Sequence, residues 1–119
     1  MERDWELIRK ILLGLAQLAD SSSILSPEEV SGYSTDLVSY HMQLMRDGGF
    51  IQARDIELNA GIYCVAMRLT WEGHELLSRM HDRTMWNRVK KTVREKGLSL
   101  SFEAIKAAAN IVIGAMMKP

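Results

Sequence analysis

The stretch from residue 35 to residue 77 restricts the fold more than any other part of the sequence. Its first part, residues 35–47, has the spacing of a helix, and the glycine pair at 48–49 can supply the left-handed residue that closes it. Its last part, residues 69–77 (LTWEGHELL), has the pattern of a strand that turns directly into another helix. Between them lies room for two short strands and a hairpin tip at residues 59–61. This order of elements is typical of a winged helix-turn-helix.

Two further helices are expected before this stretch. Asp4 can cap a first helix that carries apolar residues at steps of three and four along one face. These residues are Trp5, Ile8, Ile11, Leu12 and Leu15. Ser26, Pro27 and Glu29 supply an N-cap, a proline in the first turn and a glutamate three residues on, so a short second helix should begin there and end near Gly32.

Periodicity also predicts which side chains face the core. In the helix at 35–47, the inward face should carry Val38, His41, Met42 and Met45, and the outward face Thr35, Asp36, Ser39 and Gln43. The strand at 62–69 should place Tyr63, Val65, Met67 and Leu69 on one face and Cys64, Ala66 and Arg68 on the other. The helix that Thr70 caps should bury Trp71, His74, Leu77 and either Met80 or His81.

Two more helices are predicted after the winged helix: a basic one at 84–96, ended by Gly97, and an apolar one at 101–117, capped by Ser101. We therefore expect a mainly α chain with a small two- or three-stranded antiparallel sheet. The winged helix-turn-helix should occupy residues 1–81, and a helical extension at residues 82–119 should pack on the same single domain. At 119 residues the chain has room for one core.

Composition is that of a soluble globular protein, with 47% hydrophobic and 25% charged residues. The lone Cys64 excludes an internal disulfide, and the N-terminus has no signal-peptide pattern, so we expect a cytoplasmic protein. The apolar run at 107–117 is about half the roughly 20 residues that a membrane-spanning helix needs. No membrane association is expected.

Charge is unevenly distributed along the chain, although the net charge is zero. Residues 1–78 carry twelve Asp and Glu against six Lys and Arg, whereas residues 79–96 carry two acidic against seven basic residues. An acidic domain body repels nucleic-acid phosphates, whereas the basic helix at 84–96 could attract them. The charge pattern therefore bears directly on function.

Several segments resemble a known family. They are residues 3–4, 7–12, 40–42, 68–74 and 98–103, together with Trp86, Val89 and Lys90. These segments are similar to the bacterial and phage family called domain of unknown function 2513, and residues 68–74 (RLTWEGH) are the most specific part. The resemblance implies a small winged-helix protein, often found among prophage and mobile-element genes, with no established activity. Family members tend to have a charged last helix, whereas residues 107–117 are nearly free of charge here, which favours a buried partner surface.

Catalysis is not expected. His74 and His81 would lie two helical turns, roughly 10 Å, apart on one face, which is too far to share a metal without a third ligand. The sequence has neither a glycine-rich phosphate loop nor the two histidines, four residues apart around a glutamate, of a zinc protease. We expect no catalytic residue, no metal and no cofactor.

Two functions of different kinds remain open. The first is a DNA-binding transcriptional regulator of phage or mobile-element origin that acts as a dimer. Its nucleic-acid contacts would come from Thr35, Ser39, Tyr40, Gln43, Arg46, Arg54, Arg88, Lys91 and Arg94. Its subunits would meet through the last helix, at Phe102, Ile105, Ala109, Val112, Ile113 and Met116.

The second function is a protein-interaction module that keeps the winged-helix scaffold and binds a host or phage protein without binding nucleic acid. The usual role of the fold favours the regulator, which is our first expectation, whereas the charge distribution favours the module. The apolar last helix is compatible with both, because it can pack either across the first helix or against another chain.

Overall fold

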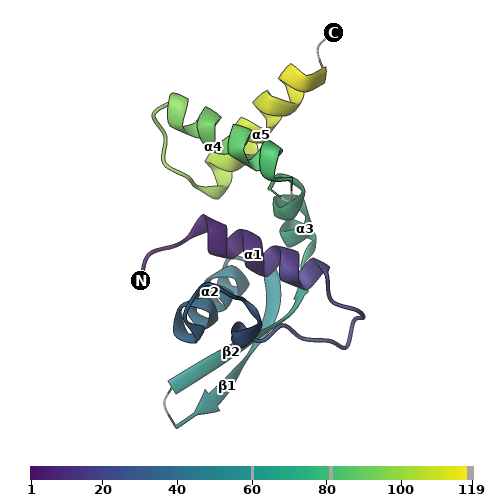
Figure 1. Cartoon of the computed structure of the whole chain (residues 1–119), viewed down its shortest axis with the longest axis vertical. Helices are drawn as coiled ribbons and strands as arrows, with labels where there is room; N and C mark the ends of the chain where they lie inside the picture. The colour runs from purple at the N-terminus through teal and green to yellow at the C-terminus, as the bar shows by residue number, and fades with distance from the viewer. Residues whose placement is uncertain (60, 81, 118–119) are drawn as a thin grey trace. The chain divides into compact units, whose positions relative to one another are not determined.

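A computed structural model describes residues 1–59, 61–80 and 82–117 (Figure 1). Its elements are α1 (Trp5–Ala16), the one-turn 3-10 helix η1 (Pro27–Glu29), α2 (Thr35–Asp47), β1 (Ile51–Leu58), β2 (Gly61–Leu69), α3 (Trp71–Ser78), α4 (Arg83–Glu95) and α5 (Phe102–Met117). The chain is mainly helical with a small antiparallel sheet, as the sequence predicts. Backbone contacts divide it into an N-terminal unit, Met1–His74, and a C-terminal unit, Glu75–Pro119. The division falls within α3, before the predicted boundary at residues 81–82.

Helix α1 begins where the sequence predicts. The Asp4 carboxylate accepts hydrogen bonds from the backbone N–H groups of Glu6 and Leu7, at 2.9 and 3.2 Å, which satisfies two donors of the first turn. The Asp4 N–H in turn donates to His41 Nε2 at 2.8 Å, and His41 Nδ1 lies 3.0 Å from the Leu37 carbonyl oxygen. With Nε2 as the acceptor, Nδ1 is the ring nitrogen placed to donate to the Leu37 carbonyl. This buried histidine ties the start of α1 to α2.

The two strands form one antiparallel hairpin in which Ile51 pairs with Leu69. Gln52 pairs with Arg68 and Ala53 with Ala66, so Met67 is the extra residue of a β-bulge. The bulge makes the prediction for the faces of β2 wrong. Leu69 lies on the face of Ala66 and Cys64, and Arg68 on that of Val65, because one additional residue reverses the alternation.

A third segment borders the hairpin through a single residue. Leu25 donates its N–H to the Ala66 carbonyl at 2.8 Å and accepts from the Ala66 N–H at 3.0 Å. Cys64, Val65 and Ala66, the residues of β2 around this bridge, are all buried. The sheet is thus two-stranded, with a one-residue bridge where a third strand would lie.

The junction between the sheet and α3 is held by residues of the LTWEGH segment. The Thr70 hydroxyl donates to the Gly49 carbonyl at 2.6 Å and accepts from the Gly73 N–H at 3.1 Å. Gly49 has a φ of +84°, so it is the left-handed residue that allows the turn after α2. A Cβ atom at Gly73 would overlap the carbonyl oxygen of Phe50. Only glycine therefore lets α3 approach the start of β1 this closely.

The position of Gly73 corrects the predicted buried face of α3. Leu77 and Met80, which follows the end of α3, are buried as predicted, together with Gly73 and Leu76. Trp71 is 79% exposed and His74 is exposed, so the prediction for these two is wrong. Residues two positions apart on a helix point about 200° apart, so a helix that turns Gly73 inward turns Trp71 outward. His81, the alternative seam residue, lies outside the described residues.

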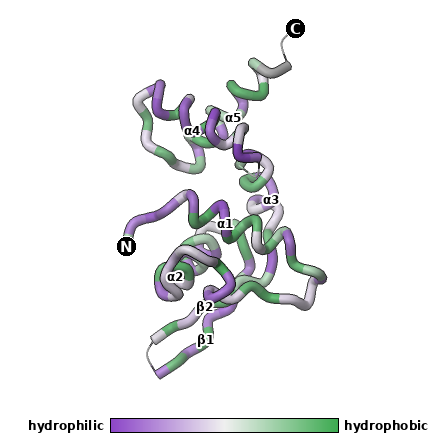
Figure 2. Tube along the Cα trace, in the orientation of Figure 1, coloured by the Kyte–Doolittle hydropathy of each residue, from purple (hydrophilic) through white to green (hydrophobic). Residues whose placement is uncertain are grey.

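The C-terminal unit contains a helical hairpin of α4 and α5. Asp82 caps α4 by accepting from the Met85 N–H at 3.0 Å, and Gly97, with a φ of +71°, follows its end. The Ser101 hydroxyl accepts from the Ala104 N–H at 3.1 Å at the start of α5. Figure 2 shows hydrophilic residues along α4 and mostly apolar ones along α5. Their facing sides are buried, with Trp86, Val89 and Val93 on α4 and Ile105, Ala108, Ala109 and Val112 on α5.

Candidate interaction surfaces

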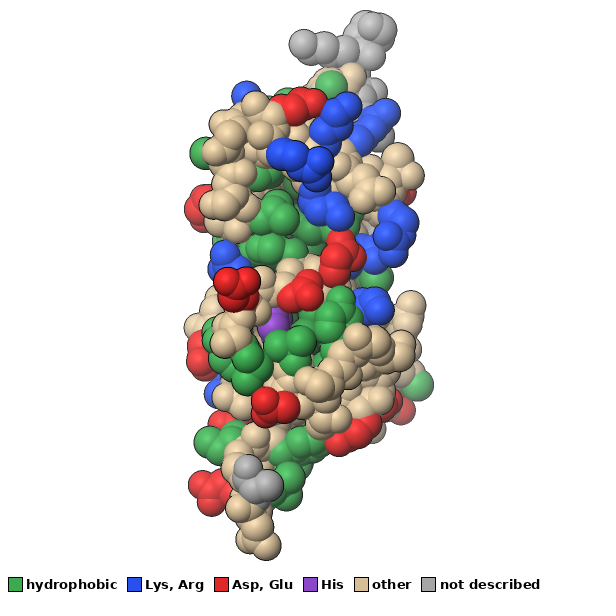
Figure 3. Space-filling model, turned by 60° about the vertical axis from the view of Figure 1, so that its left-hand side comes forward, with side chains coloured by type: hydrophobic (Ala, Val, Ile, Leu, Met, Phe, Trp, Pro, Cys, Tyr) green, Lys and Arg blue, Asp and Glu red, His purple; other side chains and the backbone are tan. Residues whose placement is uncertain are grey.

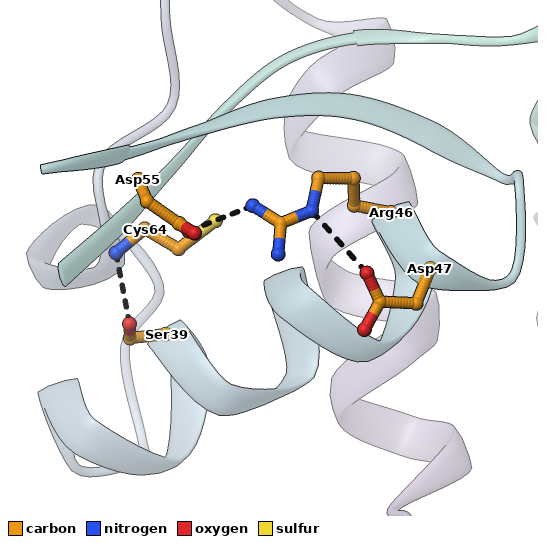
Figure 4. A network of polar contacts seen from close by, with 5 residues as sticks. All are labelled: Ser39, Arg46, Asp47, Asp55 and Cys64. Atoms are coloured by element: carbon orange, nitrogen blue, oxygen red, sulfur yellow. Dashed lines mark hydrogen bonds and ion pairs between the residues drawn. The ribbon is translucent and has the colours of Figure 1, made fainter. Parts of the chain in front are cut away.

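Ser39 does not lie on the outward face of α2, and this prediction is wrong. Its side chain is 3% exposed, and its hydroxyl accepts a hydrogen bond from the Cys64 N–H at 2.9 Å (Figure 4). The hydroxyl thus satisfies a backbone donor of β2 that has no strand partner on that side. Ser39 is a structural link between α2 and the hairpin, and it cannot contact a base edge.

Arg46 is also engaged within the N-terminal unit. Its Nη1 lies 2.7 Å from Asp55 Oδ1 and its Nε 3.4 Å from Asp47 Oδ1 (Figure 4). The hydrogen bond from Arg46 to Asp55 raises the pKa of the guanidinium. Because the two carboxylates neutralise it, Arg46 ties α2 to β1 and offers little attraction to an external phosphate.

The remaining candidates on α2 give a mixed surface. Thr35 is exposed, and Tyr40 and Gln43 are partly exposed. Asp36 and Asp47 are exposed on the same helix. The exposed part of α2 therefore has polar groups for hydrogen bonding. It is negatively charged, however, whereas a helix that binds DNA needs positive charge near the phosphates.

Cys64 is completely buried next to this network. Burial raises the pKa of its thiol to about 11, and the charge of Asp55 adds to the effect. A thiol that keeps its proton at neutral pH is a poor nucleophile and a poor metal ligand. Among the described residues, no group of three or more His, Cys, Asp and Glu side chains is placed to hold a metal ion.

The hairpin tip exposes large apolar side chains that are not among the predicted contact residues. Ile56, Leu58 and Ile62 are 38%, 55% and 55% exposed. Arg54, the predicted DNA contact on β1, is exposed, and the acidic Asp55 and Glu57 follow it. The alternation of apolar and acidic residues from 55 to 58 predicts a strand with Ile56 and Leu58 on a buried face, so this pattern does not reveal their exposure.

Helix α4 carries a basic stripe on its exposed side. Arg88, Lys91 and Arg94 are exposed and recur every three residues, so they lie on one side of the helix. Lys91 Nζ lies 3.8 Å from Oε1 of the exposed Glu95. An ion pair so exposed to solvent contributes little to stability. Figure 3 shows the Lys and Arg side chains gathered on the surface of the C-terminal unit. All three predicted phosphate contacts of α4 are thus accessible.

The predicted interface residues of α5 divide into two groups. Ile105, Ala109 and Val112 are buried within the C-terminal unit, which has α5 packed against α4, so they are not a free surface. Phe102 is half-buried and Ile113 is 43% exposed, and the Met116 side chain lies outside the described residues. Ile111, at 47% exposure, is an exposed apolar residue outside the predicted interface set.

A groove of about 510 Å³ runs between α4 and α5. Its polar wall comes from α4 and its apolar wall from α5. The lining residues are Arg88, Lys91, Thr92 and Glu95 on α4 and Ile111, Val112 and Ala115 on α5. Part of the basic stripe and part of the exposed apolar surface of α5 therefore meet in one concave site.

In the part of the chain that the structure describes, no helix is long and apolar enough to cross a membrane.

Comparison with known proteins places the chain in a family. Residues 2–99 match the family described as hypothetical protein (DUF2513). The chain belongs to this family. A relative, an uncharacterized protein of Haemophilus influenzae, is 39% identical over 117 residues, which cover 98% of this chain and 99% of that protein. No solved structure matches the chain.

The family match has a structural boundary. It includes the N-terminal unit and α4, and it ends at residue 99, before α5 begins at Phe102. The match to the Haemophilus influenzae protein continues nearly to the end of the chain. The DUF2513 match therefore contains both the hairpin and the basic stripe, whereas the apolar wall of the groove lies beyond it.

Proposed function

We propose that this DUF2513 protein is a protein-interaction module built on a winged helix-turn-helix, and that the β1–β2 hairpin is its contact surface. The order of elements supports the scaffold: α1, the Leu25 bridge, η1, α2, the hairpin and α3 follow one another as the parts of a winged helix do. In this assignment α2 takes the place of the recognition helix and the hairpin that of the wing.

The apolar hairpin tip is the observation that carries the proposal. A wing that contacts DNA presents Lys or Arg to the phosphates. Here residues 54–62 (RDIELNAGI) contain one basic and two acidic residues, and Ile56, Leu58 and Ile62 are exposed to solvent. Exposed clusters of large apolar side chains mark protein-contact sites, because burying each of them removes unfavourable apolar surface from water.

A photo-crosslinking experiment tests the proposal. A photoreactive amino acid placed at Leu58 in the full chain, expressed in a bacterial cell, should yield covalent adducts with protein. The same group at Ser31, exposed on a polar loop of the same unit, is the matched control and should yield few adducts. Equal yields at the two positions would mean that the hairpin is no preferred contact surface.

DNA binding is the second candidate, and the basic stripe of α4 favours it. In this alternative the protein is a dimeric regulator of phage or mobile-element origin whose Arg88, Lys91 and Arg94 hold phosphates. Thr35, Tyr40 and Gln43 would then have to read bases without help from Ser39 or Arg46, which are committed to internal contacts. The loss of two of the predicted contacts on α2 is the reason we place this function second.

Fluorescence anisotropy with a random DNA duplex separates the two functions. Binding that is strong at low salt, falls steeply with added salt and is lost in Arg88→Ala/Lys91→Ala would select the regulator. The control Lys10→Ala/Arg68→Ala removes the same charge from the N-terminal unit and should leave such binding in place. For the interaction module, we expect no duplex binding even at low salt.

A further inference from the structure

We propose that the partner of the hairpin is a second copy of this chain, whose groove between α4 and α5 receives the hairpin tip. This inference rests on the proposed function, because it identifies the partner of the same contact surface. It uses two features that each occur within a single unit: the apolar and acidic tip of β1–β2, and the apolar and basic groove of the C-terminal unit.

The groove has the size and chemistry to accept aliphatic side chains. Its volume of about 510 Å³ exceeds by more than threefold the roughly 150 Å³ of a protein cavity that holds benzene. Ile111 and Ala115 offer apolar surface on one side. On the other side, Arg88 and Lys91 exceed by one charge the single carboxylate of Glu95, which forms a solvent-exposed pair with Lys91 at 3.8 Å. A ligand for this site needs apolar groups beside a negative charge.

The hairpin tip presents that combination. Glu57 pairs with Ile62 across the two strands, so a carboxylate and a large apolar side chain lie next to each other on one face. Both are exposed, as is the neighbouring Leu58. Asp55 is held by Arg46, which leaves Glu57 as the carboxylate available to the groove. Ile62 would enter beside Ile111 with Glu57 directed to Lys91, and Leu58 lies on the opposite face of the hairpin, because it pairs with Gly61.

The charge of the two units favours this contact over one between like surfaces. Residues 1–74 carry eleven Asp and Glu against six Lys and Arg, a net charge of −5, and residues 75–119 carry nine basic against four acidic residues, a net charge of +5. A dimer through α5 alone would bring two positive units together. A hairpin in a groove brings opposite units together, either reciprocally in a closed dimer or onward in a ring or chain.

The contact area sets the expected strength. A hairpin tip in one groove is smaller than the roughly 1,600 Å² of a standard stable interface, so we expect a weak association that depends on concentration. The charged part of this contact is exposed to solvent, so the association should weaken as added salt screens the attraction between the charges. Self-association in the micromolar range at low salt is the expected behaviour of the full chain.

Variants that reverse the charge of Glu57 or Lys91 test the inference, with their self-association measured by sedimentation velocity. At about 100 μM protein in about 50 mM salt, the wild type should sediment as dimers or larger species. Glu57→Lys alone and Lys91→Glu alone should each raise the dissociation constant at least tenfold, because each places like charges in the contact. An equimolar mixture of the two variants should associate again. In the mixture, the lysine introduced on one hairpin meets the glutamate introduced in the other chain's groove, and the second contact of the pair is native.

Matched controls separate the contact from net charge. Glu2→Lys and Arg83→Glu make the same kinds of change at exposed positions outside the hairpin and the groove, and they should leave association intact. Circular dichroism verifies that each variant folds. A wild type that stays monomeric overturns the inference, and so does a mixture that fails to associate. A monomer that binds duplex DNA through Lys91 also overturns it, in favour of a phosphate site.

The proposed function can survive this failure. A monomeric wild type whose Leu58 position still crosslinks to another protein would retain the hairpin as an interaction surface and lose only the second copy as its partner. A wild type that associates but shows no crosslink between Leu58 and its own chain would place the self-contact elsewhere and overturn the inference. Adducts of Leu58 with other proteins would then decide the proposed function separately.

Discussion

Burial of Cys64 should make the stability of the N-terminal unit depend on alkaline pH. The pKa of its thiol rises from 9.0 to about 11 in the folded chain, mainly because burial disfavours the thiolate. Between these values the unfolded chain has lost a proton that the folded chain keeps. The stabilisation is therefore complete below about pH 9 and is lost as pH rises through about 11, by about 1–3 kcal/mol.

Urea unfolding of the wild type and of Cys64→Ala at about pH 8 and about pH 10.5 measures this contribution. The other alkaline groups titrate alike in both proteins, so the difference between the two pH slopes isolates the thiol. The wild type should lose more stability than the variant over this range. Parallel losses in the two proteins would show that the thiol titrates normally in the fold.

Gly73 should be the glycine least tolerant of a methyl group. Gly73→Ala places a Cβ on the Phe50 carbonyl oxygen, so either α3 or the start of β1 must move, at an expected cost of about 3 kcal/mol or more. Gly114→Ala is the matched control, because a Cβ there meets no other atom and a helical alanine is favoured by about 0.5–1 kcal/mol. Chemical denaturation of both variants checks the difference, and a Gly73→Ala protein as stable as wild type contradicts the close approach.

At the scale of elements, the two tryptophans of α3 and α4 should differ in their effect on stability. Trp86 is 1% exposed in the C-terminal unit, so Trp86→Ala should cost about 3–5 kcal/mol and leave that unit unfolded or marginal. Trp71 is 79% exposed, so Trp71→Ala should change stability by less than about 1 kcal/mol. Thermal unfolding compares the pair directly. Equal losses would mean that α3 presents a different face from the one described.

For the whole molecule, the opposite charges of the two units should govern its behaviour in dilute salt. The net charge is zero, with −5 in residues 1–74 and +5 in residues 75–119. Molecules of this kind attract one another through opposite surfaces, and salt screens that attraction. We expect the second virial coefficient from static light scattering to rise as salt increases from about 20 to about 300 mM. A coefficient that falls over this range would mean that apolar contacts dominate.

The sequence determined the longer helices and where they begin, because these depend on groups close together in the chain. The short helix expected to end near Gly32 is a single 3-10 turn, Pro27–Glu29. Asp4, Ser101 and Asp82 satisfy the first N–H groups of their own helices, and Gly49 and Gly97 supply left-handed conformations that other residues disfavour. The 3.6-residue period likewise predicted most of the buried face of α1. Local chemistry is sufficient for such features, since caps and periods do not depend on what packs against the helix.

The tertiary structure decided which side chains of each element remain available to a partner. Ser39 is turned to Cys64, Arg46 is neutralised by Asp55, and Trp71 is turned outward by the contact between Gly73 and Phe50. Each of these placements depends on a residue distant in the chain or on the direction of close packing. Neither helix propensity nor the 3.6-residue period of apolar residues encodes such contacts. The bulge at Met67 and the groove between α4 and α5 are of the same kind, because register and concavity exist only once two elements have met.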